Sequence, residues 1–137
     1  MKVALSQNCL VCKQSSNSAI CHYCIADLTL FDIDRHHHNL MLSPKVSLGL
    51  TKVDFTQVMA LADYQWPLSM LLTGLKFSKH IPNAHALATL FVRHCLSSMP
   101  VLPQLIIPMP LHKNRYLFRK FNQSIELTKQ ICKLTQL

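Results

Sequence analysis

The sequence predicts an α/β protein in which a small metal-stapled module precedes a segment of mixed helix and strand. Three observations predict this class: two Cys-x-x-Cys pairs near the amino terminus, two apolar stripes at helical spacing in the middle, and an apolar run at residues 104–109 that precedes a third helical pattern. At 137 residues, half of them apolar, the chain has room for one ordinary domain or for a small module plus part of a larger one. We place the boundary between residues 55 and 56.

The four amino-terminal cysteines form two closely spaced pairs. Each pair offers two thiolates from one turn, and two such turns can enclose a tetrahedral zinc ion at Zn–S distances of about 2.3 Å. Few large apolar side chains surround them, so metal binding would supply folding free energy that burial does not. Two disulfides or a redox pair are the alternatives, but a reducing compartment disfavours disulfides and no thioredoxin-like pattern is present. The spacing favours one structural zinc ion held by Cys9, Cys12, Cys21 and Cys24.

The other potential metal ligands have simpler interpretations. His36, His37 and His38 are adjacent, and three neighbouring residues do not readily turn their rings toward one ion, so we expect a solvated loop. Cys95 and Cys132 lie on expected helices among apolar neighbours. We expect both to be small core residues rather than ligands or nucleophiles.

Two helices are expected in the middle of the chain. The first begins at Pro67, ends near Lys76 and has an apolar stripe of Leu68, Leu71, Leu72 and Leu75. Asn83 can cap the second helix, which stops before Pro100 and Pro103. Its apolar face consists of Ala84, Leu87, Ala88, Phe91 and Cys95.

Strands are expected on either side of this helical pair. Residues 56–64 predict a short buried strand, and residues 104–109 predict a strand buried on both faces, as in a parallel sheet. Asn122 or Ser124 can cap a final helix with Leu127, Ile131 and Leu134 on one face.

Positive charge is concentrated in the second half of the chain. The formal net charge is +8; residues 1–60 contain five Lys or Arg against four acids, whereas residues 61–137 contain nine against two. Such a segment favours phosphate-bearing partners, either nucleic acid or a small phosphorylated ligand. The amino terminus has no secretory pattern, and the most apolar window, residues 99–111, is short and contains four prolines. We therefore expect a cytoplasmic protein without a membrane span.

The connection between the expected strand at 104–109 and the final helix is long and basic. In open parallel sheets, ligands bind where strands end and helices begin, because backbone N–H groups and the helix dipole favour anions there. Long ordered loops are commonly functional. A pyrophosphate or phosphoribosyl group would suit the cationic side chains of this loop, which are His112, Lys113, Arg115, Arg119 and Lys120.

Three blocks in this order resemble the ComF/GntX-type family: the cysteine pairs, the sequence ADYQWPLSMLLTGLKFSKH at 62–80 and IIPMPLHKNRYLFRKFNQS at 106–124. The resemblance covers nearly the whole chain. It implies a zinc-ribbon-like module at 1–55 and a type I phosphoribosyltransferase-like domain at 56–137. It also implies that residues 104–109 are the first core strand and that the next loop takes the pyrophosphate-loop position.

The resemblance assigns phosphate contacts to the loop after that strand. Arg115, Arg119, Asn122 and Gln123 match an Arg…Arg-Gly-Phe-Asn-Gln signature, and His112 and Lys113 add charge. Lys120 stands where the signature has glycine. The ligand would be phosphoribosyl pyrophosphate with Mg²⁺ bridging the diphosphate.

The acidic-pair Thr-Thr-Gly segment that such enzymes use for the ribose phosphate is not found, since the one Thr-Gly pair, Thr73-Gly74, lies within a helical pattern. We therefore expect a truncated, catalytically incomplete member with no catalytic residue of its own. A strand left without its parallel neighbours predicts an apolar surface and a self-associating or complementing chain.

Two other functions stay open. Tyr116, Phe118 and Phe121 alternate with Arg115, Arg119 and Lys120, which are the ingredients of a single-strand stacking groove, and some relatives are linked with DNA uptake during natural transformation. The protein would then be a single-stranded DNA-binding or competence accessory protein. The third interpretation is a zinc-stabilised interaction module that docks on a partner.

Overall fold

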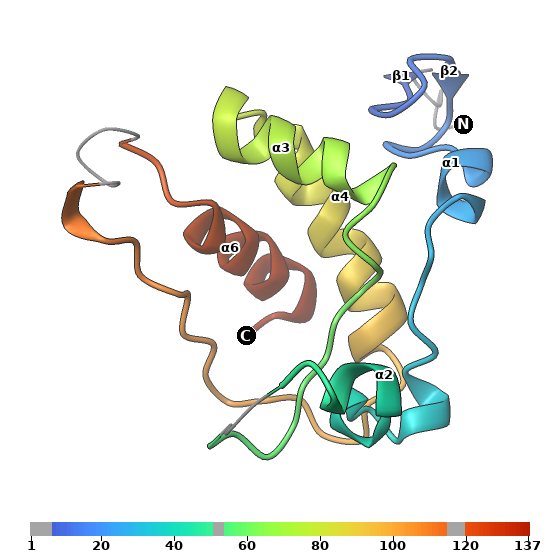
Figure 1. The fold of residues 1–137 in the computed structure, drawn as a ribbon. Coiled ribbons are helices and arrows are strands. Elements are labelled where there is room, and N and C mark those ends of the chain that lie inside the picture. Colours follow the sequence, from blue (N-terminus) through green and yellow to red (C-terminus); the bar gives the residue numbers. More distant parts are fainter. Residues whose placement is uncertain (1–6, 51–53, 115–119) are drawn as a thin grey trace.

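The structure is a computed structural model that describes residues 7–50, 54–114 and 120–137. Helices dominate these residues, and the sheet consists of two short antiparallel strands (Figure 1). The elements are β1 Gln7–Asn8, β2 Ser15–Ser16, α1 His22–Ala26, η1 Asp34–His36, η2 Leu40–Leu42, α2 Pro44–Ser47, α3 Leu68–Ser78, α4 Ile81–Phe91, η3 Val92–Leu96 and α6 Gln123–Thr135.

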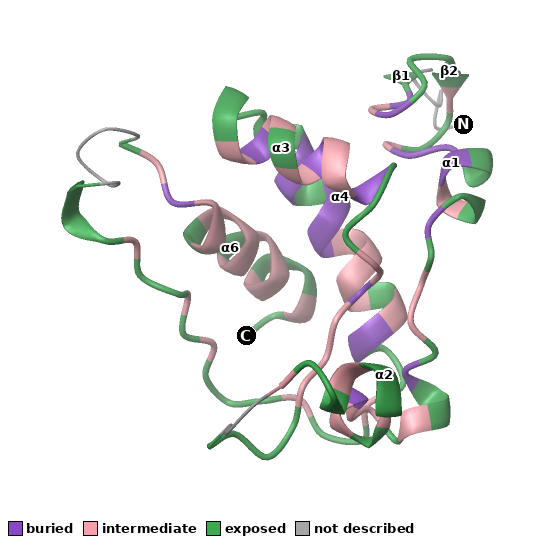
Figure 2. Cartoon of the chain, viewed as in Figure 1, coloured by how far each residue is buried: buried purple, intermediate pink, exposed green. Residues whose placement is uncertain are grey.

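Helix α4 is the centre of the fold, with α3 and α6 packed against it (Figure 1). The side chains of Leu71 and Leu75 in α3 are fully buried, as is that of Ala84 in α4. Buried residues lie along α3 and α4, and others lie in the amino-terminal turns, whereas α6 has residues of intermediate or full exposure (Figure 2). The stripes expected from the sequence are therefore confirmed in α3 and α4, and the Asn122 side chain caps α6 by accepting a hydrogen bond from the Ser124 N–H at 2.9 Å.

The turn between α3 and α4 is built around Asn83. The sequence predicted Asn83 as a helix cap, which is wrong: α4 begins at Ile81, and Asn83 is a buried residue of its first turn. The Asn83 Nδ2 donates to the Leu71 carbonyl at 2.9 Å, and the Asn83 Oδ1 lies 2.7 Å from the His80 Nδ1. The nitrogen and the oxygen of the amide thus both have hydrogen-bond partners, and the side chain connects α3 to the start of α4.

Helix α4 continues into η3, a turn of π-helix at Val92–Leu96. Such turns carry one extra residue and are found often at functional sites. Here the turn places Cys95 fully inside the core, as expected, and leaves His94 facing the amino-terminal half. The His94 Nε2 lies 3.0 Å from the carbonyl oxygen of Phe31, a residue 63 positions earlier.

The two halves of the chain share one buried cluster. Residues 29–31 run antiparallel to residues 61–63, with a Leu30–Ala62 bridge and a hydrogen bond of 3.1 Å from the Phe31 N–H to the Leu61 carbonyl. The strand predicted at 56–64 is reduced to this bridge. Side chains of three amino-terminal cysteines and of α3 and α4 belong to the same hydrophobic cluster, which contains Cys9, Leu71 and Leu87.

The prediction of a strand at residues 104–109 is wrong. The segment is extended but joins no ladder in the described part of the chain, because no neighbouring strand runs beside it. Its alternate side chains face solvent: Leu105, Ile107 and Met109 are 73%, 79% and 74% exposed. The described residues therefore form a helix-dominated fold with a small two-stranded sheet, without the parallel sheet of a phosphoribosyltransferase-like domain. Within the described ranges, no helix combines the length and apolar composition that a membrane crossing needs.

Gly74 lets Asn83 approach α3, so we expect the variant Gly74→Ala to be less stable. A Cβ at position 74 would lie 2.7 Å from the Asn83 Nδ2, which is closer than packing allows. Alanine gains about 1 kcal/mol in helix propensity, whereas disrupting a buried hydrogen-bonded amide costs about 1–3 kcal/mol. We expect a net loss of about 1 kcal/mol in unfolding free energy, measured by urea titration.

The matched control is Gly49→Ala, because a Cβ at position 49 would meet only the Val46 carbonyl at 3.5 Å, an ordinary contact. We expect that variant to keep the unfolding free energy of the parent. Equal stability of Gly74→Ala and the parent would show that Asn83 does not hold the turn.

Candidate metal centre and anion-binding loop

The first cysteine pair lies on a tight turn between β1 and β2. The pairing of Gln7 with Ser16 and of Asn8 with Ser15 brings the two arms together. The turn is closed by a 3.0 Å hydrogen bond from the Lys13 N–H to the Cys9 carbonyl. Lys13 has a φ of 63°, the left-handed conformation that lets the chain reverse immediately after Cys12.

The second pair is carried by the start of α1. Cys21 precedes the helix in an extended conformation and Cys24 lies within its first turn. The Cys21 N–H donates to the Cys9 Sγ at 3.4 Å, as does the Val11 N–H at the same distance. Backbone donors thus converge on one sulfur from both turns.

The four predicted ligands come together. The sulfur atoms of Cys9, Cys12, Cys21 and Cys24 all lie within 4.8 Å of one another, and the Cys12 and Cys21 sulfurs are 3.7 Å apart. Tetrahedral zinc with Zn–S bonds of about 2.3 Å requires sulfur separations of about 3.8 Å. Three of the four side chains are buried and Cys12 is exposed. The cluster could hold a metal ion, and its donor set is consistent with structural zinc.

Burial and hydrogen bonding shift the pKa values of Cys9 and Cys24 in opposite directions. Burial opposes ionisation of Cys9, yet N–H donors of Cys21, Cys12 and Val11 lower its pKa to about 6. Burial raises the pKa of Cys24 to about 12, and hydrogen bonds with the other three thiols add to this increase. The Cys9 thiol therefore ionises more readily than the Cys24 thiol, and a bound metal ion would favour the thiolate form of its cysteine ligands.

The other candidate ligands stay apart from this centre. In the described part of the chain, the four cysteines are the single group of His, Cys, Asp and Glu side chains close enough to share an ion. The His38 Nε2 lies 3.9 Å from the Asp34 Oδ1, and His37 points into solvent. Cys95 is buried, and its burial raises the pKa of its thiol to about 11, so it is a core residue, as expected.

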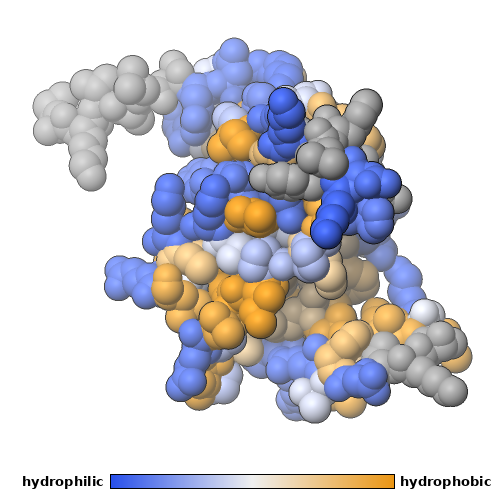
Figure 3. Space-filling model, turned by 90° about the vertical axis from the view of Figure 1, so that its left-hand side faces the viewer, coloured by the Kyte–Doolittle hydropathy of each residue, from blue (hydrophilic) through white to orange (hydrophobic). Residues whose placement is uncertain are grey.

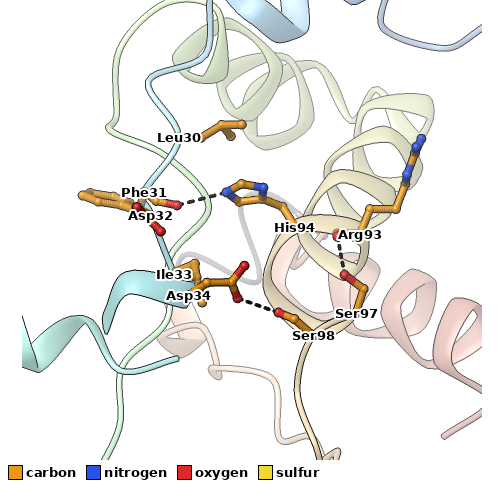
Figure 4. A pocket seen from close by; sticks show the side chains of 9 residues that line it. All are labelled: Leu30, Phe31, Asp32, Ile33, Asp34, Arg93, His94, Ser97 and Ser98. Carbon is orange, nitrogen blue, oxygen red and sulfur yellow. Dashed lines mark hydrogen bonds between the residues drawn. The ribbon is translucent and has the colours of Figure 1, made fainter. Parts of the chain in front are cut away.

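A cavity of about 380 Å³ lies where η3 meets residues 30–34 (Figure 4). Two of its hydroxyl groups hydrogen-bond to other lining residues: the Ser98 hydroxyl donates to the Asp34 carboxylate at 2.9 Å, and the Ser97 hydroxyl donates to the Arg93 carbonyl at 2.6 Å. The sequence analysis missed this site because its walls come from segments more than 50 residues apart. The hydrogen bond from Ser98 to Asp34 at this cavity connects the two halves of the chain.

The predicted anion-binding loop is described at its two ends. His112 and Lys113 are exposed at its beginning, and Lys120 is exposed near its end. Arg115 and Arg119 lie outside the described residues. The structure therefore places Asn122 and Gln123 together at the start of α6. His112 and Lys113 lie before residues 115–119, which the structure does not describe.

Asn122 has a structural role at this helix start. It is 6% exposed, caps α6, and donates through its Nδ2 to the Met109 carbonyl at 3.1 Å. This bond ties the extended segment to the helix. The Gln123 Oε1 is buried and has no hydrogen-bond partner among the described residues. Lys120 has a φ of 48°, so a lysine occupies a left-handed conformation at the position where the ComF-type signature has glycine.

Comparison with known proteins identifies relatives over half of the chain. The DNA utilization protein YhgH of Escherichia coli O157:H7 is 39% identical over 72 residues, which cover 50% of this chain and 32% of the relative. The proteins of the same name from Salmonella typhi and Salmonella typhimurium are 37% and 38% identical, with the same coverage. The match thus spans about a third of the length of these relatives. No family model matches the chain, and no solved structure matches it.

Removal of the metal tests the cysteine centre. We expect a chelator to lower the melting temperature, because Cys9, Cys21 and Cys24 belong to the common buried cluster. The variant Cys9→Ser should bind zinc at least tenfold more weakly, whereas Cys132→Ser, outside the cluster, should match the parent in zinc content and melting temperature. Metal analysis and calorimetric melting measure both. A parent protein that melts identically with and without chelator would contradict a structural metal.

Proposed function

We propose that the protein handles DNA, binding single-stranded DNA in a DNA-uptake or competence-related role. The observation that carries this proposal is the similarity, at 37–39% identity over half of the chain, to proteins named for DNA utilization. The strong positive charge supports it, because neutralising phosphates with lysine and arginine supplies most of the affinity of sequence-independent nucleic-acid binding.

The loop before α6 supplies one set of phosphate contacts in this proposal. Lys113 and Lys120 are exposed, and neither belongs to an ion pair within the described part of the chain. The sequence between them contributes Arg115, Tyr116, Phe118 and Arg119. Cations that alternate with aromatic residues suit single strands, whose phosphates need neutralising and whose bases stack on rings.

Zinc has a structural part in the same proposal. The 3.7 Å separation of the Cys12 and Cys21 sulfurs fits tetrahedral coordination, and all four ligands are thiols, a set that zinc prefers. A metal-bound knuckle would hold the amino-terminal half rigid against α4. The metal then stabilises the binding surface and takes no part in chemistry.

Salt dependence tests the DNA proposal. We expect a labelled oligothymidylate to bind the full chain with an affinity that falls steeply as salt rises. In single strands each lost phosphate contact reduces the slope of log affinity against log salt by about 0.7, so Lys113→Gln combined with Lys120→Gln should reduce it by about 1.4. Fluorescence anisotropy across a salt series gives both values.

The control is Lys129→Gln, because Lys129 is already paired with Glu126 at 2.8 Å. That variant should retain the parent slope. A chain that fails to bind the oligonucleotide at low salt would exclude the proposed function.

A second candidate is binding of phosphoribosyl pyrophosphate with Mg²⁺ at the same loop. The observation in its favour is the unpartnered, buried Oε1 of Gln123 at the amino-terminal end of α6, since an unsatisfied buried oxygen invites a donor such as a ribose hydroxyl. The family resemblance of the loop supports the choice of ligand. In this proposal Lys113 and Lys120 neutralise the diphosphate.

Calorimetry with the variant Gln123→Leu tests the second candidate. Replacing an unsatisfied buried amide by an apolar side chain of similar size should leave stability unchanged or raise it. If the oxygen serves the ligand, the same change should weaken binding of phosphoribosyl pyrophosphate with Mg²⁺ at least tenfold. Titration heat that is identical for parent and variant would remove Gln123 from the site.

A further inference from the structure

The end of α3 carries unpaired positive charge in a part of the chain that has no acids. Residues 64–125 contain seven Lys or Arg and no Asp or Glu. Lys76 lies in the last turn of α3 and Lys79 follows the helix directly. Within the described residues, the ion pairs of lysines are those of Lys45 and Lys129, so neither Lys76 nor Lys79 has an acidic partner.

Lys79 occupies a backbone conformation that glycine would adopt more easily. Its φ is 52°, and its N–H, like that of His80, hydrogen-bonds to the Gly74 carbonyl to end the helix. Helices commonly end with glycine in this left-handed conformation because a Cβ is disfavoured there. Lysine at this position therefore opposes local stability.

The two cations are held by a rigid turn. The buried Asn83 amide hydrogen-bonds to the Leu71 carbonyl and to His80, which fixes the chain on both sides of Lys79. The Lys76 ammonium lies 5.2 Å from the centre of the Phe77 ring, a distance at which the ring attracts the cation. Preorganised charges lose less conformational entropy when they bind a ligand.

The turn lies on the same side of the molecule as the ends of the basic loop. In Figure 1 the junction of α3 with α4 and the chain that leads into α6 both face the left-hand side. Figure 3, which views that side, shows hydrophilic side chains over its upper half, above hydrophobic surface. Lys113 and Lys120 flank this loop in the sequence, so in the proposed function a polyanion bound there would extend toward the end of α3.

We infer that Lys76 and Lys79 form a second phosphate-binding patch, which holds the backbone of a nucleic-acid strand bound at the loop before α6. This inference rests on the proposed function and adds the end of α3 to the binding surface. The partner is a polyanion with regularly spaced phosphodiesters. Lysine suits such a partner because its ammonium group interacts with the phosphate charge and does not distinguish one base from another.

The test combines DNA affinity with thermal stability in two variants of the full chain. In Lys76→Gln/Lys79→Gln, the affinity for labelled oligothymidylate should fall at low salt, and the salt slope should decrease by about 1.4. In Lys79→Gly, the affinity should also fall while the melting temperature rises by roughly 4 °C, because strain is relieved. A loss of affinity together with a gain in melting temperature would show that the Lys79 side chain serves binding at the cost of stability.

Two controls match the charge change and the backbone change separately. Lys129→Gln removes a charge that Glu126 already neutralises and should retain the parent affinity. Gln136→Gly relieves a positive φ of 60° at the end of α6 without loss of charge, so it should raise the melting temperature and leave DNA binding unchanged.

The outcomes separate the patch from the proposed function. If the parent binds DNA with a salt-dependent affinity and the double variant keeps both its affinity and its slope, the patch is excluded and the DNA proposal stands. Loss of affinity for anionic lipid vesicles, with DNA binding retained, would assign the patch to a membrane surface and also overturn the inference. If the parent itself does not bind oligothymidylate, the proposed function fails first.

Discussion

The convergence of four sulfur atoms within 4.8 Å of one another is the constraint on which the amino-terminal half depends. The strands beside it are two residues long, and a pair of that length has no stability of its own in water. A shared metal would replace the missing hydrophobic core of this segment. Because Cys9, Cys21 and Cys24 also belong to the cluster formed by α3 and α4, the metal would stabilise the helical half as well.

A metal-bound cysteine centre would be opposite in charge to the lysines of the helical half. A zinc ion with four thiolates carries a net charge of about −2, and this charge would be enclosed by backbone N–H groups in the amino-terminal turn. Lys13 lies in the cysteine turn itself. Other lysines without an ion pair in the described residues lie at the end of α3 and around the loop before α6. In the proposed function, a polyanion would bind to the helical half, and the metal centre would contribute by keeping the amino-terminal half rigid.

Local features were predictable from the sequence, and features that depend on distant partners were not. The cysteine pairs and the stripes of α3 and α4 follow from spacing within a few residues, and the structure confirms the stripes and brings the four sulfurs together. The segment at 104–109 has a strand-like composition, but a strand also needs a neighbour, which composition does not supply. Asn83 was misassigned because a capping residue and a buried bridging residue look alike in sequence. The contact between His94 and Phe31 spans 63 positions and has no local signal.

The exposed segment before the basic loop has a consequence for the behaviour of the protein in solution. Val101, Leu105, Ile107 and Met109 are each more than 70% exposed, on a chain whose formal charge is +8. At low ionic strength, repulsion between the positively charged molecules keeps these exposed apolar segments apart. Concentrated salt screens this repulsion and strengthens apolar association. In the proposed function, the salt concentrations that release a bound polyanion from the lysines would thus also favour precipitation. A purification that elutes the protein with salt would therefore work best at high dilution.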